Sequence, residues 1–134
     1  MKRLAIVVVI ALAGFAAAFV AFGDAARRNC VLDATSNPAY SAEFDDVRVG
    51  EDTKVLRVVR DGQPVSDAWV CVNVAPAGGS GAGVAAEARE LAAGRYGVSL
   101  DVTNTGPWRG TVLVEDDPGH PVAIPVTFEV AGGD

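Results

Sequence analysis

The stretch RVVRDGQPVSDAWVCVNV, residues Arg57–Val74, contains two β-strand patterns joined by a turn. Its first part belongs to the β-branched run 53–60, which predicts a strand. Asp61-Gly62 favours the left-handed backbone angles of a tight turn, and Pro64 cannot donate a ladder hydrogen bond where the next segment starts. From Ala68 onward, valines alternate with other residues, which predicts a half-buried strand. The stretch is therefore predicted to be a β-hairpin.

The same two-residue alternation recurs along the rest of the chain. It predicts further strands at residues 84–89, 95–102, 108–116 and 122–130, with Tyr96 and Trp108 on core-facing positions. Pro125 makes the last of these an edge or bulged strand, because proline lacks the backbone N–H. No helix is predicted after residue 23. We therefore expect an all-β domain, an immunoglobulin-like (Ig-like) antiparallel β-sandwich of about seven strands.

The first 22 residues, MKRLAIVVVIALAGFAAAFVAF, are typical of a membrane-directed hydrophobic helix. Lys2 and Arg3 precede Leu4–Phe22, a run of 19 residues without a charged or polar side chain. At about 1.5 Å per residue, a helix of this length nearly spans the roughly 30 Å of bilayer hydrocarbon. Secretory signal cores are shorter, about 7–15 residues, so the length favours an uncleaved signal anchor. A signal peptide cleaved near Gly23 is the alternative, because Ala21 and Gly23 place small residues at both cleavage-determining positions.

Both readings of the N-terminal segment predict that the rest of the chain is exported. The basic start favours a cytoplasmic N-terminus, and so a single-pass protein of the cell membrane with an extracytoplasmic C-terminal domain. Cleavage would instead give a secreted protein. The predicted organisation is a signal anchor or signal peptide at 1–23, a linker with edge strands at 24–52, and the core of the β-sandwich at 53–134.

The charge of the exported part narrows the choice of partners. Residues 24–134 hold nine of the eleven basic residues and all 17 acidic ones, a formal charge of −8. This excess of negative charge argues against nucleic acid as a partner. The expected partners are the membrane, through residues 4–22, and an unidentified membrane or extracytoplasmic protein.

The two cysteines, Cys30 and Cys71, are predicted to form a disulfide, because an even number of cysteines in an exported protein indicates pairing. Closing a loop of this size stabilises a domain by roughly 4 kcal/mol in the chain-entropy model. Two separate buried thiols are the alternative. Two cysteines at this spacing, without supporting histidines, make a poor metal site.

No pattern in the sequence indicates catalysis. His120 is a lone histidine in a Pro-Gly turn, where we expect it to be exposed, and the glycine-rich run 75–83 lacks the G-K-[ST] of a phosphate loop. The acidic groups 115–117 and 45–52 match no calcium-loop spacing and are expected to be solvated. Trp69 faces away from the valine layer, which fits either a partner surface or cover by the N-terminal segment. We therefore predict no enzyme activity, no catalytic residue, no metal site and no cofactor.

Three short motifs carry a resemblance to a known family. They are D-G-x-P-V-x-x-A at Asp61, Gly62, Pro64, Val65 and Ala68, then G-x-Y at Gly94 and Tyr96, then G-x-W at Gly106 and Trp108. In these motifs, over about residues 53–130, the chain resembles the exported, membrane-attached Ig-like domains of the YtkA/FixH group. The resemblance implies an N-terminal anchor, a β-sandwich and a role beside membrane metal or respiratory machinery.

The sequence departs from that group where many of its members carry methionine and histidine. The equivalent stretch here, residues 75–90, reads APAGGSGAGVAAEARE and contains neither residue, although soft copper ions prefer thioether, thiolate or imidazole ligands. We therefore predict a non-catalytic Ig-like module for binding or assembly beside a membrane complex. A copper-handling or metal-transport accessory protein of YtkA/FixH type is the alternative.

Overall fold

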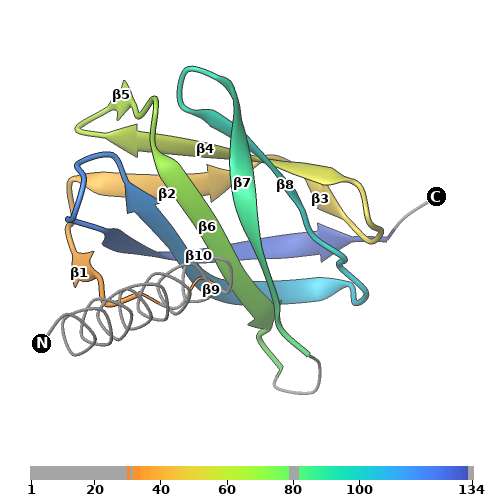
Figure 1. Ribbon diagram of the computed structural model, residues 1–134. Coiled ribbons are helices and arrows are strands. Elements are labelled where there is room, and N and C mark those ends of the chain that lie inside the picture. The colour runs from red at the N-terminus through yellow and green to blue at the C-terminus, as the bar shows by residue number, and fades with distance from the viewer. Residues whose placement is uncertain (1–29, 31, 79–81, 133–134) are drawn as a thin grey trace, which may run out of the picture.

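The computed structural model describes residues 30, 32–78 and 82–132, and these form an all-β domain (Figure 1). The predicted all-β class is confirmed. The predicted anchor or signal peptide lies outside the described residues. The ten strands are β1 (Thr35–Ser36), β2 (Tyr40–Phe44), β3 (Val47–Arg48), β4 (Thr53–Arg60), β5 (Gln63–Pro64), β6 (Trp69–Pro76), β7 (Val84–Ala92), β8 (Arg95–Ser99), β9 (Gly106–Glu115) and β10 (Val122–Ala131).

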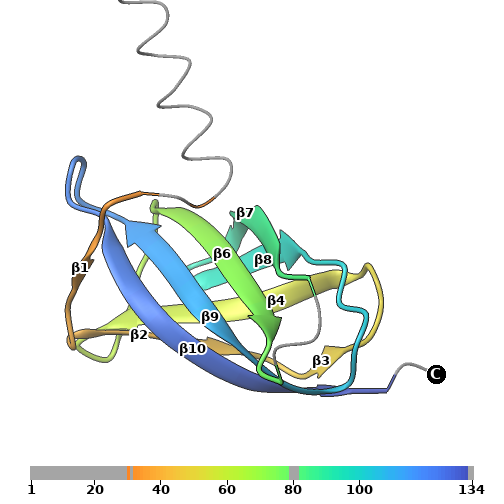
Figure 2. The same ribbon diagram turned by 90° about the horizontal axis from the view of Figure 1, so that it is seen from below.

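The strands form one mixed sheet that curls into a half-barrel (Figure 2). Its order is β1-β10-β9-β6-β7-β8-β4-β2, with β3 beside β10 and β5 beside β4. The long strand β7 makes the bend, because residues 84–88 pair with β6 whereas residues 89–92 pair with β8. The curl brings β2 close to β10, where the rings of Phe44 and Phe128 lie 4.6 Å apart.

The predicted antiparallel sandwich of about seven strands differs from the structure in strand number and direction. Seven strands have at least five residues, and β1, β3 and β5 add three two-residue strands. β1 and β3 run parallel to β10, which makes the sheet mixed. A two-residue pairing has no periodicity from which it can be predicted. Pro125 lies between these two contacts, so the middle of β10 pairs only with β9. A proline is tolerated in this part of the strand because one of its edges has no ladder partner.

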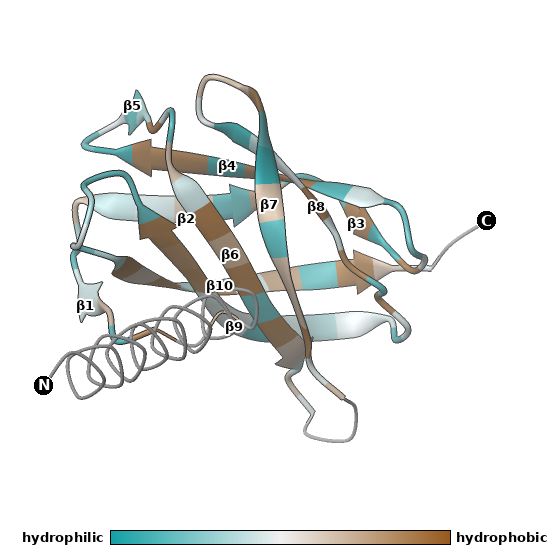
Figure 3. Cartoon of the chain, viewed as in Figure 1, coloured by the Kyte–Doolittle hydropathy of each residue, from teal (hydrophilic) through white to brown (hydrophobic). Residues whose placement is uncertain are grey.

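Alternate residues of the longer strands fill the inside of the half-barrel. Figure 3 shows brown hydrophobic stretches along β4 and β6. Tyr96 and Trp108, which the alternation assigns to the core, are 0 % and 1 % exposed, and the Trp108 Nε1–H donates to the Asn104 carbonyl at 2.9 Å. The valine face of β6 is buried as well, and its members are Val70, Val72 and Val74. Burying these side chains supplies the main favourable term in folding.

The turn motif and Tyr96 meet at one corner of the domain. Asp61 and Gly62 have φ values of 52° and 78°, the left-handed pair that a tight two-residue hairpin requires. This turn joins β4 only to the two-residue strand β5, and β6 pairs with β7 and β9 instead, so the predicted hairpin between the run 53–60 and the valine strand is wrong. Gly94 packs directly on Pro64, since a Cβ at Gly94 would lie 2.5 Å from the Pro64 Cβ. The Tyr96 hydroxyl donates to the Val65 carbonyl at 2.8 Å. The first two motifs of the family resemblance are therefore parts of one packed corner.

The buried Tyr96 hydroxyl makes stability depend on alkaline pH. Burial is the main cause that raises the pKa of Tyr96 to about 12; the Ala68 N–H opposes this and the Glu90 charge adds to it. Its contribution to stability is complete below pH 10, the usual pKa, and is lost as the pH rises toward about 12. We expect Tyr96→Phe to cost about 1 kcal/mol at pH 8 and to reduce this alkaline loss. Urea unfolding between pH 8 and 11.5 measures both effects.

The control for this prediction is Tyr40→Phe. Burial and the hydrogen bond to Asp116 also raise the pKa of Tyr40. The Tyr40→Phe variant therefore shows how much of the alkaline loss of stability comes from Tyr40 rather than from Tyr96. An alkaline profile that is the same in Tyr96→Phe and the unchanged protein would contradict the assignment.

Gly110 is predicted to be indispensable for the approach of β9 to β6. A Cβ at this position would lie 2.7 Å from the Val74 Cα and would also clash with the Asn73 carbonyl oxygen, both of which are backbone atoms. We expect Gly110→Ala to lower the free energy of unfolding by at least about 2 kcal/mol. Gly78→Ala is the control, because nothing lies within 4 Å of a Cβ there. Equal unfolding midpoints for the two variants would contradict the prediction.

Candidate binding groove

The predicted disulfide joins Cys30 to Cys71, so the alternative of two separate thiols is wrong. It fixes the N-terminal strap, defined as Cys30 and Leu32–Ala34, to β6 near the start of that strand. Cys71 is fully buried, and Cys30 is only 7 % exposed. Leu113 completes this small cluster, and the half-buried Trp69 packs against it. Trp69 thus contacts the cluster that holds Cys30 and keeps part of its side chain exposed, so both interpretations of Trp69 stay predictions.

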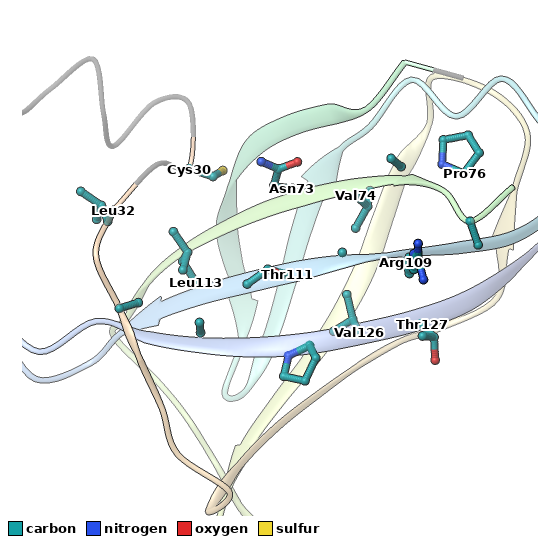
Figure 4. A pocket seen from close by; sticks show the side chains of 16 residues that line it. Cys30, Leu32, Asn73, Val74, Pro76, Arg109, Thr111, Leu113, Val126 and Thr127 are labelled. Carbon is teal, nitrogen blue, oxygen red and sulfur yellow. The ribbon is translucent and has the colours of Figure 1, made fainter. Parts of the chain in front are cut away.

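The strap closes one end of a groove on the outside of β6, β9 and β10 (Figure 4). This outer groove has a volume of about 710 Å³. Figure 4 places Cys30 and Leu32 toward one end, and Arg109 and Thr127 farther along. Three rows of residues in cross-strand register form most of its floor: Leu113–Ala123, Asn73–Thr111–Pro125 and Ala75–Arg109–Thr127.

The groove exists because the outward positions of these strands carry small or uncharged side chains. Alanine, threonine and proline fill most of the rows, and Gly110 has no side chain. The same alternation that turns valines inward leaves these residues on the outside. The alternation of β6 places Cys71 and Asn73 on the face away from its valines. The alternation does not bring the outward residues of β9 and β10 together with them, because those neighbours depend on strand order and register.

Arg109 is the only charged residue among the described residues that line the outer groove. Its side chain is exposed, and the described structure gives it no ion pair. Glu129 lies one step diagonally across the ladder, opposite Pro107, and is not bonded to Arg109. Arg109 also borders an adjoining hollow of about 450 Å³ that includes Phe128. The groove therefore combines an apolar floor with one available cation.

The outer face of β2, β4 and β8, here called the opposite face, has a different character. Arg57 Nε lies 3.3 Å from Asp45 Oδ1, and Arg95 Nη2 lies 3.2 Å from Asp45 Oδ2. Arg57 also approaches Glu43, at 3.8 Å. The cations of this face are thus already paired within the domain. A partner that uses them would first have to compete with these internal carboxylates.

The other residues considered for chemistry are separated in the structure. His120 is exposed, and its backbone N–H donates to the Asp117 carbonyl at 3.0 Å. Asp116 instead accepts from the Tyr40 hydroxyl at 2.8 Å and lies 3.9 Å from an Arg60 nitrogen. Within residues 30, 32–78 and 82–132 there is no cluster of three or more metal-ligating side chains. The same part of the chain contains no helix long and apolar enough to cross a membrane.

Comparisons with known proteins add no relative to this description. No family model, no curated protein and no solved structure matches the chain.

The Cys30–Cys71 bond is predicted to carry a large part of the stability. With 41 residues of separation, the chain-entropy model gives about 4 kcal/mol for its effect on the unfolded state. We expect the free energy of unfolding of the double variant Cys30→Ala/Cys71→Ala, measured with urea, to be lower than that of the unchanged protein by this amount. Reductant should shift only the unchanged protein. A reductant-insensitive midpoint in the unchanged protein would contradict the prediction.

Proposed function

We propose that this chain is a non-catalytic binding or assembly module that acts outside the cytoplasm beside a membrane complex. The observation that carries the proposal is the contrast between the two outer faces. One face has paired charges, whereas the other has an apolar groove with an unpaired arginine. An exposed apolar hollow bordered by polar groups is typical of a surface that binds a partner.

The strand order supports an Ig-like arrangement as part of this proposal. β2-β4-β8 with the end of β7 corresponds to one Ig sheet, and β10-β9-β6 with the start of β7 corresponds to the other. The two halves of the curled sheet then take the place of two separate layers. The YtkA/FixH resemblance belongs to the same proposal, and it is supported by the packing of Gly94 on Pro64 at the motif corner.

The proposed location is the extracytoplasmic face of the cell membrane, with Leu4–Phe22 as the anchor. Residues 23–29 separate that run from Cys30, which borders the outer groove. Fully extended, this connection reaches at most about 28 Å. The disulfide would therefore hold the groove within reach of proteins that share the same membrane. Secretion after cleavage near Gly23 is the alternative, and the intact mass of the exported protein distinguishes the two.

The test of the proposed function is co-purification of the full chain with a stoichiometric partner from its own membranes. We expect Thr111→Arg, which places an unpaired positive charge on the groove floor that an apolar partner would have to desolvate, to abolish the complex. The matched control is Thr53→Arg, the same substitution on the opposite face, where Thr53 is exposed. Circular dichroism establishes that both variants are folded. A complex that survives both substitutions, or one that is never found, would contradict the proposal.

Copper handling is the alternative function that the family resemblance implies. Titration of the detergent-solubilised full chain with Cu(I) and with Cu(II) separates it from the binding function. Copper binding at micromolar or tighter affinity would favour the alternative. In that case Thr111→Arg, which disrupts the groove, should leave the affinity for copper unchanged.

A further inference from the structure

We infer that the outer groove binds an apolar segment of a membrane-associated protein partner, and that a carboxylate on this segment pairs with Arg109. This inference rests on the proposed binding function and adds the chemistry of the partner. Two independent properties of the groove carry it. They are the apolar, small-residue floor, and the single arginine beyond it.

The floor selects an uncharged, apolar contact. Ala75, Thr111 and Pro125 present short side chains, so another polypeptide can approach the sheet closely. Asn73, at the centre, is exposed and offers one amide for a backbone or side-chain hydrogen bond. A charged side chain lying on this floor would lose hydration without gaining a partner, except near Arg109. The central part of the bound segment is therefore apolar.

Arg109 selects a negative group at one end of that segment. A guanidinium presents five N–H donors in a fixed plane and matches a carboxylate with two parallel hydrogen bonds. The cations of the opposite face are already bonded to Asp45, whereas Arg109 is exposed and unpaired in the described structure. Since residues 24–134 carry a formal charge of −8, one arginine in an apolar groove is a specific feature rather than part of a basic surface.

The strap determines the direction from which the partner comes. Cys30 and Leu32 wall the groove at the end where the described chain begins, and the disulfide holds them there. A connection of seven residues then leads back to the apolar run Leu4–Phe22. A partner segment that follows or precedes its own membrane span reaches the groove from this side. Its apolar part lies on the three-strand floor, and its acidic residue lies against Arg109.

The experiment replaces Thr111 by the photo-reactive amino acid benzoylphenylalanine in the full chain, in its native membrane. A second chain carries the same group at Thr53 on the opposite face. After irradiation, mass spectrometry maps the cross-linked peptide. We expect position 111, and not position 53, to join to an apolar segment of another membrane-associated protein with an Asp or Glu within a few residues.

Arg109→Glu in the same chain tests the charge pairing. We expect the yield of this cross-link to fall at least about tenfold, as for the loss of a close ion pair at an interface. Replacing the mapped carboxylate by lysine in the partner should restore the yield. Arg89→Glu is the matched control, because Arg89 is an exposed cation on β7 outside the groove. We expect Arg89→Glu to leave the yield unchanged.

The remaining outcomes overturn the inference in distinguishable ways. Cross-linking from position 111 to a lipid, to a second copy or to residues 1–29 would identify a different occupant. A cross-linking yield that does not change in Arg109→Glu would show that no carboxylate of the partner pairs with Arg109. A partner captured only from position 53 would leave the binding function in place and exclude the groove. Capture from neither position would overturn the proposed function together with the inference.

Discussion

The register of β6, β9 and β10 is the constraint on which both the core and the outer groove depend. Val72, Val112 and Ile124 lie opposite one another and point into the half-barrel. The next row along the same strands must then point outward, because side chains alternate across a sheet. That row is Asn73, Thr111 and Pro125. A shift of one residue in any of the three strands would expose valines and bury these groove residues.

Much of the fold follows from short-range features of the sequence. The β-branched run 53–60 coincides with β4, Asp61-Gly62 adopts the left-handed angles of its turn, and the cysteine count indicates the disulfide. Edge strands were expected within residues 24–52, where β1 and β3 lie, but their bounds and their parallel pairing did not follow, because each pairs for two residues with a partner more than 80 positions away. Their contacts depend on the finished shape of β10. No periodic pattern in residues 24–52 encodes them.

The outer groove could not be predicted from the alternation of single strands. Alternation shows that Arg109 and Thr127 lie on the non-core faces of their strands. It does not show that both are neighbours of Ala75, which requires the order β10-β9-β6. Nor does it distinguish an arginine with an internal carboxylate, such as Arg57, from one without. That difference depends on which residue of β2 lies across from β4, and hence on tertiary register.

The position of the disulfide determines how the domain bears mechanical load. Tension along the chain between its two ends passes through the Cys30–Cys71 bond and enters the sheet near the start of β6. The covalent loop that contains β1–β5 is bypassed and remains slack. Pulling on the tether would leave the hairpin at Asp61-Gly62 unstretched.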